Sequence, residues 1–471
     1  MRRKLIRNIS ANTSQLVVNQ LFGLVIFYVL SNSLNKDSFG KINLVLAILH
    51  TAFNILSCGI DQIAVKKIAS GKDAGKILSL YIVHVVTAGL LFYILILSAY
   101  FLFPNVPIPY PLLIFIGIGK LMIFFSSPFK QITMGLEKFN LLAYMSIVSN
   151  IIRGLALVIL ALLNTLSLSS IVIIFICGDF LELTICMYLC KYKLLIPLKF
   201  EWNKGDYTSL IKEAFPQVGV VLFTSAIARF DWIFIGIFLS SIKLAEYSFA
   251  WKVFEISTLP LLAVAPLLLP LFTRLSKERA AHEDKLYHFL RFEMIVASLV
   301  VLVLNVCWVP VIDAVTSGKY GLVNADTVLI LSLCMPFLYF NNFMWSIYFA
   351  DGKLKFILFV IGVTFFVNLI GDILMIPFLK NEGAALSYLL AMVVQFILYI
   401  SKTDLTKLRS MIYSLILCFS SAFLGALLAQ LIFINTFYIL LSAVLFYLIF
   451  LKICAQLNFN DLKRIKQLGN M

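Results

Sequence analysis

Charged residues are scarce in this chain of 471 residues: 13% are Asp, Glu, Lys or Arg, while 62% are hydrophobic. Soluble globular proteins carry about 25% charged residues, so this composition excludes that class. Each helix that crosses a bilayer needs about 20 mostly apolar residues, and the chain contains many such runs. The expected fold class is therefore an all-α polytopic membrane protein.

Histidine and closely spaced cysteine are also scarce. The chain has 4 histidines and 8 cysteines, and no Cys-x-x-Cys spacing occurs among them. No histidine lies with cysteines or carboxylates at the spacing of metal ligands. We expect no metal site, no cofactor and no catalytic residues.

Apolar runs divide the chain into about fourteen expected transmembrane helices, six before a basic loop at 191–212 and eight after it. The expected spans are 12–31, 41–60, 77–103, 110–129, 140–163, 169–190, 214–239, 245–272, 290–312, 325–349, 356–378, 383–400, 411–433 and 436–456. The loop between the second and third expected spans, which contains Lys66 and Lys67, is expected to be short, basic and cytoplasmic.

The placement of Lys and Arg predicts the orientation, because cytoplasmic loops carry an excess of both. With the N-terminus inside, 29 of the 38 basic residues fall in cytoplasmic segments and five in external ones. Both termini are therefore expected in the cytoplasm. The formal charge of +15 then reflects topology and attraction to anionic lipid, so nucleic acid is not an expected partner.

Nine charged residues are expected inside spans, where each costs about 2.5 to 3.5 kcal/mol at the bilayer centre. They are Lys120, Arg153, Arg229, Lys252, Asp179, Glu182, Asp231, Glu255 and Asp372. Asp179 and Glu182 share one helix face, and Lys120 is their nearest opposite charge by depth. Arg153 either contacts an anionic substrate or pairs with a carboxylate of a neighbouring helix, and the sequence leaves both readings open.

A helical hairpin is expected at 215–275, with its turn near 240–244. Depth matching then places Arg229 level with Glu255 and Asp231 level with Lys252. Because Arg229 and Asp231 are two residues apart, they project to opposite sides of their helix, so both pairs do not fit one interface. We expect Arg229, Lys252 and Glu255 to face the substrate route. A static clamp between the two helices is the alternative.

The first span carries a polar stripe at helical spacing. It consists of Asn8, Asn12, Gln15 and Asn19. Such a stripe avoids lipid either by hydrogen bonding to another helix or by lining a polar passage. Asn12 and Asn19 are therefore candidates for the substrate route.

An internal repeat of about 210 to 218 residues predicts the domain organisation. Ser38-Phe39 corresponds to Ser248-Phe249, Phe139 to Phe356, and Asn150 to Asn368. Because each repeat has six helices, an even number, both halves begin on the same side of the membrane. We expect a six-helix lobe at 1–200, a second at 201–402, and two added helices with a basic tail at 403–471.

Three motifs carry a resemblance to a known family. They are Phe39-Gly40 after the first span, the run GIDQIAVKKIAS at 59–70, and the pattern of Asp231, Gly236, Tyr247, Ala250, Lys252 and Glu255. With the repeat, the chain resembles the polysaccharide and O-antigen flippases (Wzx-type) of the multidrug/oligosaccharidyl-lipid/polysaccharide (MOP) superfamily. The resemblance covers nearly the whole chain.

This resemblance implies two six-helix lobes around a central V-shaped cavity, as in MATE transporters. It implies alternating-access transport of an undecaprenyl-diphosphate-linked oligosaccharide across the bacterial inner membrane. The substrate-binding candidates are Arg153, Arg229, Lys252, Lys120, Asn12 and Asn19. The candidates for ion coupling or charge pairing are Asp231, Glu255, Asp179, Glu182 and Asp372. The implied partners are the lipid-linked glycan, membrane lipid, a coupling H⁺ or Na⁺, a polysaccharide polymerase and a chain-length regulator.

Two other transport functions fit the same pattern, namely a lipid II flippase and a cation-coupled multidrug exporter. A more distant alternative is a membrane polysaccharide polymerase or glycosyltransferase. Such an enzyme needs convergent acid/base or metal-binding carboxylates outside the membrane. The longest expected external loop, 313–325, offers only Asp313 and Lys319 and no convergent carboxylates. We therefore expect a transporter and not an enzyme.

The basic-residue asymmetry predicts the side of each loop. Reporter fusions at Lys204 and at Asn435 are expected to read cytoplasmic and external, respectively, when assayed with a pair of reporters that are each active on one side only. If both fusions read the same side, the predicted topology is wrong.

Overall fold

Every regular element in the described part of the chain is a helix. The computed structural model describes residues 2–197, 203–261, 272, 283–403 and 411–457. Its helices are α1 (Arg2–Ser33), α2 (Lys36–Leu56), α3 (Ile60–Ala69), α4 (Ala74–Leu102), α5 (Tyr110–Gly135), α6 (Phe139–Leu162), α7 (Leu168–Tyr192), α8 (Lys204–Phe238), α9 (Ser241–Ser257), α11 (Glu283–Thr316), η2 (Leu322–Asn324), α12 (Ala325–Ser332), α13 (Met335–Ala350), α14 (Leu354–Lys402), α16 (Met411–Ile432) and α17 (Thr436–Ile453). The predicted all-α class is confirmed.

Eleven helical stretches among the described residues are long and apolar enough to cross a membrane. The long helix α14 contains two expected spans, 356–378 and 383–400, which meet at Lys380 with a non-helical φ of 54°. The first expected span falls in α1, and the expected span 245–272 starts in α9 and continues into residues outside the described part. The count of about fourteen is therefore approximate.

One segment differs from the sequence-based expectation. Residues 60–69 were expected to form part of a cytoplasmic loop, yet they form helix α3. Gly59 separates α3 from α2 with a left-handed φ of 69°, which glycine adopts without steric cost. Apolar residues at helical spacing, among them Ile60, Ala64 and Ile68, are buried, and this burial stabilises the helix.

Polar residues between the apolar runs begin several helices. The side chains of Asn35, Asp73, Ser167, Asn203 and Asn435 accept hydrogen bonds from backbone N–H groups in the first turns of α2, α4, α7, α8 and α17. These bonds satisfy donors that a helix start leaves without an intrahelical partner.

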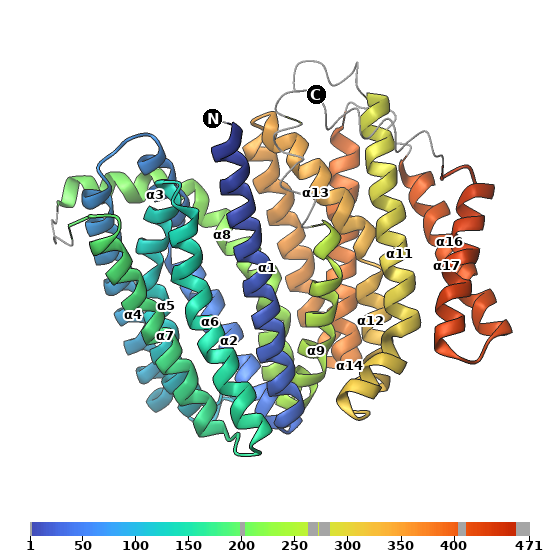
Figure 1. The fold of residues 1–471 in the computed structure, drawn as a ribbon, viewed down its shortest axis with the longest axis horizontal. Helices are drawn as coiled ribbons and strands as arrows, with labels where there is room; N and C mark the ends of the chain where they lie inside the picture. The colour runs from blue at the N-terminus through green and yellow to red at the C-terminus, as the bar shows by residue number, and fades with distance from the viewer. Residues whose placement is uncertain (1, 198–202, 262–271, 273–282, 404–410, 458–471) are drawn as a thin grey trace. The chain divides into compact units, whose positions relative to one another are not determined.

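The chain forms two compact units, Met1–Ala245 and Glu246–Met471, with the boundary inside α9. In the first unit α5 packs against α2, α3, α4, α6 and α7, while α1 packs along α6 and α2 along α8 (Figure 1). In the second unit α11 packs against α12, α13, α16 and α17, and α14 packs against α12 and α13. The expected division at 1–200, 201–402 and 403–471 stays a prediction.

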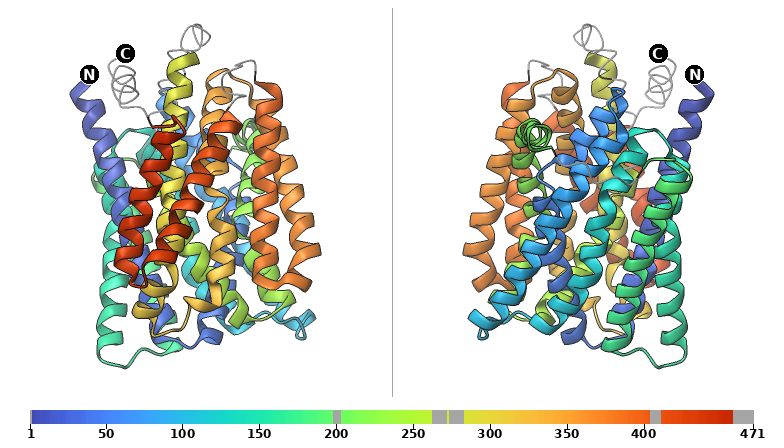
Figure 2. Two further views of the ribbon diagram at one scale, coloured as in Figure 1. Left: turned by 90° about the vertical axis from the view of Figure 1, so that its right-hand side faces the viewer. Right: turned by 90° about the vertical axis from the view of Figure 1, so that its left-hand side faces the viewer.

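Helix α8 changes direction within the first unit. Its first part lies across the neighbouring helices, and two views at right angles agree on this (Figures 1 and 2). The remainder, Gln217–Phe238, is one of the stretches able to span a membrane. The crosswise part is held against the unit by Leu210 and Ala214, which are buried.

The Phe39-Gly40 motif has a packing explanation. Phe39 is fully buried, and a Cβ on Gly40 would lie 1.7 Å from the backbone oxygen of Ser241 at the start of α9. Beside it, the Ser241 hydroxyl donates to Asp37, which also forms an ion pair with Lys41 at 2.6 Å. Only glycine at position 40 permits this approach of α2 to Ser241.

The substitution Gly40→Ala is expected to destabilise the protein by about 1 to 3 kcal/mol, since the clash is with backbone and not with a flexible side chain. Thermal unfolding in detergent measures the effect. The matched control is Gly23→Ala in α1, where an added Cβ meets nothing within 4 Å. Equal melting temperatures for the two variants would contradict the packing explanation.

A partly buried carboxyl group lies at the junction of α3, α4 and α5. Asp61 in the first turn of α3 accepts a hydrogen bond from the Tyr81 hydroxyl of α4, and that hydroxyl lies 3.4 Å from the Ser127 hydroxyl of α5. Burial raises the pKa of Asp61 from 3.8 to about 6, opposed in part by a hydrogen bond from Ser57. The folded protein therefore binds a proton here more tightly than the unfolded chain does.

This pKa shift predicts a pH-dependent stability. Because the folded pKa is raised, its contribution to stability is present at low pH and is lost as the pH rises through about 6. Asparagine in place of Asp61 is neutral at every pH. The melting temperature of the Asp61→Asn variant is therefore expected to exceed that of the wild type at pH 7.5. The difference should shrink by pH 5. A difference that is the same at both pH values would contradict the assignment.

Candidate functional site

Five charged side chains from three neighbouring helices form one continuous cluster inside the first unit. Lys120 and Lys130 come from α5, Arg153 from α6, and Asp179 and Glu182 from α7. These helices pack together because α5 and α6 both lie against α7. We call these five residues the charge ladder, because positive and negative groups alternate along it.

Asp179 forms one pairing centre of the charge ladder. Its side chain is fully buried, and one carboxylate oxygen accepts from the Lys120 ammonium at 2.9 Å while the other accepts from the Arg153 guanidinium. A carboxylate taken out of water is costly unless both oxygens are paired. The two cations on opposite sides satisfy this need.

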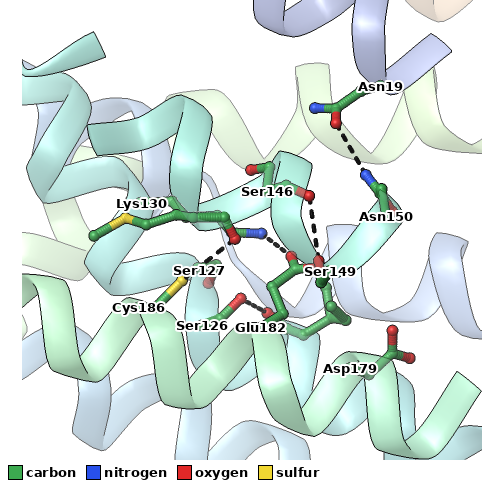
Figure 3. Close-up of polar contacts among 12 residues, drawn as sticks. Asn19, Ser126, Ser127, Lys130, Ser146, Ser149, Asn150, Asp179, Glu182 and Cys186 are labelled. Carbon is green, nitrogen blue, oxygen red and sulfur yellow. Dashed lines mark hydrogen bonds and ion pairs between the residues drawn. The ribbon is translucent and has the colours of Figure 1, made fainter. Parts of the chain in front are cut away.

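Glu182 forms the second centre, one helical turn further along α7. Arg153 Nη2 donates to it at 3.0 Å, and the Lys130 ammonium and the Ser149 hydroxyl also donate to it. Figure 3 shows the Lys130 and Ser149 side chains turned toward Glu182. Arg153 therefore bridges both carboxylates, using separate nitrogens of its planar fork.

A polar chain connects the charge ladder to the first helix. Arg153 Nη2 donates to Asn150 Oδ1 at 2.8 Å, and Asn150 Nδ2 donates to Asn19 Oδ1 of α1 at 3.0 Å (Figure 3). One member of the polar stripe in the first expected span thus bonds to another helix. The side chains of Asn8, Asn12 and Gln15 lie outside the described part.

Glycine makes room for the guanidinium. A Cβ on Gly178 would lie 2.2 Å from Arg153 Cγ and 2.5 Å from Cδ, and a Cβ on Gly119 would lie 2.8 Å from Asp179 Oδ2. The Arg153 Nε atom is buried and has no hydrogen-bond acceptor among the described residues. The ladder therefore leaves one buried donor of its central cation unused.

The charge ladder has three cations and two anions, so it carries a net charge of one positive unit. The Lys120 side chain is 23% exposed and the Lys130 side chain 19%, whereas the Arg153 side chain is 9% exposed. Chemically, such a cluster holds its own carboxylates and still favours an additional anion. The described residues contain no group of three or more His, Cys, Asp or Glu able to hold a metal ion.

The structure adds residues that sequence reasoning missed. Lys130 directly follows the expected span 110–129 and was therefore counted as cytoplasmic, but it lies inside α5 and pairs with Glu182. Ser149 was not singled out, and Asn150 was noted only for the repeat. Ser149 and Asn150 could have been found from the sequence, because each precedes Arg153 by about one helical turn on α6.

The remaining candidates of the first unit, Arg229 and Asp231, lie on α8. Arg229 Nη1 donates to the Ala228 carbonyl at 2.8 Å, and its guanidinium lies 4.5 Å from the centre of the Trp232 ring. Asp231 is buried, and its Oδ1 accepts from the Trp232 backbone N–H at 2.8 Å. Arg229 is thus stabilised by a cation–π contact, and its expected contact with Glu255 stays a prediction.

In the second unit, Lys252 and Glu255 form an ion pair at 2.9 Å along one face of α9. Asp372 of α14 is fully buried and accepts from Asn368 Nδ2 at 3.2 Å. The proposed pair between Asp231 and Lys252 likewise stays a prediction.

Solved structures show where this fold occurs elsewhere. Lipid II flippase MurJ in an inward closed conformation matches 94% of this chain and 98% of its own length at 17% identity, with a TM-score of 0.76. An inward-facing multidrug resistance MATE family transporter of the MOP superfamily matches 84% of this chain and 98% of its own, at 13% identity and a TM-score of 0.64. A MOP superfamily transporter from Pyrococcus furiosus gives 13% identity, 86% and 96% coverage and a TM-score of 0.58.

These likenesses confirm the expected MATE-like fold class. Among curated proteins, none matches the chain by sequence. The sequence pattern of the family described as "Polysaccharide biosynthesis protein" matches residues 5–276, which is more than half of the chain. This chain therefore belongs to the polysaccharide biosynthesis protein family.

Proposed function

We propose that this protein is a flippase that moves an undecaprenyl-diphosphate-linked oligosaccharide across the bacterial inner membrane by alternating access. The observation that carries the proposal is the charge ladder, a buried cluster with net positive charge in a chain of this family. The family description and the fold shared with a lipid II flippase support it. The oligosaccharide would be a repeat unit of O-antigen, capsule or exopolysaccharide.

The physical problem is the head group and not the lipid tail. A diphosphate and several sugars do not enter hydrocarbon without compensating charges and hydrogen bonds, whereas a polyprenyl tail stays in lipid. Lys120 and Lys130 keep part of their surface accessible, so a phosphate would meet ammonium groups first. Arg153 would then exchange a carboxylate for a phosphate oxygen, since its fork matches both.

Other residues have proposed places along the same route. Arg229, Lys252 and Asn19 would supply further cationic and amide groups to the substrate, as would Asn12. The acids Asp231, Glu255 and Asp372 would pair with these cations or bind a coupling H⁺ or Na⁺. A polysaccharide polymerase and a chain-length regulator are the expected protein partners, and both termini are expected in the cytoplasm.

Lipid II is a second candidate substrate, which the likeness to the lipid II flippase MurJ favours. It shares the chemistry that the charge ladder is proposed to bind. Complementation separates the two: rescue of a lipid II flippase mutant indicates lipid II, and rescue of surface glycan alone indicates the oligosaccharide.

The charge ladder predicts a specific mutational pattern in cells that lack the chromosomal copy. The substitutions Arg153→Lys and Lys120→Gln are each expected to lower surface glycan export about ten-fold or more, because each removes a charged hydrogen bond of roughly 1.5 to 3 kcal/mol. Lys138→Gln, an exposed lysine just beyond α5, is the control and should export normally. Surface glycan and membrane insertion are measured together.

Arg153→Ala is a less informative variant, since it leaves two buried carboxylates without their shared cation and is expected to impair folding. If Arg153→Lys and Lys120→Gln insert normally and export glycan at the wild-type level, the charge ladder is structural only. The proposed role in transport would then be wrong.

A further inference from the structure

The crosswise first part of α8, residues 204–215, packs one face against the rest of the first unit. Leu210 is 2% exposed and Ala214 is fully buried. The Tyr207 hydroxyl lies 2.9 Å from His84 Nδ1 of α4, and His84 Nε2 lies 2.8 Å from the Leu56 carbonyl at the end of α2. This attachment sets which side of the segment faces outward.

Both acids of the segment are neutralised by lysines of neighbouring helices. Glu213 pairs with Lys67 of α3 at 2.7 Å, and Asp206 pairs with Lys76 of α4 at 2.7 Å. The negative charges of the segment are therefore already compensated within the unit. Its own lysines receive no compensation from them.

The outward face is a shallow polar groove of about 730 Å³ lined by Lys204, Gly205, Thr208, Ser209, Lys212 and Glu213. Lys204 and Lys212 are exposed and lie about two helical turns apart, with Thr208 between them on the same side. Neither lysine has an ion-pair partner in the part of the chain that the structure describes. With respect to the described residues, this face therefore presents two cations without an ion-pair partner.

An exposed aromatic residue lies next to this groove. Phe215 is 73% exposed and follows Lys212 by three residues, which places it on a neighbouring position of the same face. Gln217, two residues later, begins the membrane-spanning part of α8. A large apolar side chain at the start of a span is stable when it enters the lipid interface.

We propose that this face of α8 binds the head groups of anionic phospholipids in the adjacent leaflet. The two lysines would contact lipid phosphates, and Phe215 would enter the acyl region. Charge complementarity selects an anionic lipid over a zwitterionic one. The position of Phe215 at the start of a span selects lipid over a soluble polyanion. This site is separate from the charge ladder and does not depend on the transported substrate.

Native mass spectrometry of the purified full chain tests the proposal. The probes are phosphatidylglycerol and phosphatidylcholine with the same acyl chains. The double variant Lys204→Gln/Lys212→Gln is expected to bind phosphatidylglycerol about 30-fold more weakly, since each lysine near an anionic surface contributes about five-fold. Its binding of phosphatidylcholine should not change, and Lys204→Arg/Lys212→Arg should retain the wild-type preference.

The matched control is Lys353→Gln/Lys355→Gln, which removes the same charge from two exposed lysines elsewhere. An equal loss in this control would mean that total charge, and not the α8 face, governs binding. Wild-type affinity in the Lys204/Lys212 double variant would overturn the proposal. So would equal displacement of the lipid by the same concentration of inorganic phosphate, because that result would indicate a site for a soluble anion.

Discussion

The cost of a charge inside hydrocarbon is the constraint on which the first unit depends. Asp179 and Glu182 are buried in the middle of a helical bundle, and neither is tolerable alone. Arg153 bridges them, and Lys120 and Lys130 complete the pairing at either end. The rotation of α5, α6 and α7 about their own axes is restricted by these pairs, because turning any one helix away would leave a buried charge uncompensated.

Asn150 and Asn368, which correspond in the predicted repeat, each bond to a charged side chain, and the two charges have opposite sign. On α6, Asn150 bonds to Arg153 one turn further along the helix. On α14, the corresponding Asn368 bonds to Asp372 one turn along. An amide suits both cases because it offers a carbonyl oxygen to a cation and an N–H group to an anion. In the predicted repeat the amide is therefore kept, while the charge of its bonded partner differs between the two units.

The first part of α8 links the membrane-spanning helices to the surface of the first unit. Its acidic residues bond inward to α3 and α4, and its lysines face outward. The basic residues from which the topology is predicted thus have different surroundings in the folded protein. Lys67 and Lys76 pair with acids of the segment, whereas Lys204 and Lys212 form no ion pair with any described residue. Counting basic residues alone does not distinguish these two roles.

Hydropathy determined the all-α class and the approximate spans, because membrane insertion depends on local runs of apolar residues. Depth along each helix also matched Lys120 with Asp179, since rise per residue is constant. Lys130 was missed because the end of a span is poorly defined by hydropathy, and helix α3 because its buried face is short. Which carboxylates Arg153 contacts depended on the rotation and crossing of three helices and on the space left by Gly178. Only the tertiary structure decided these contacts, because partners distant in sequence meet through packing and not through local pattern.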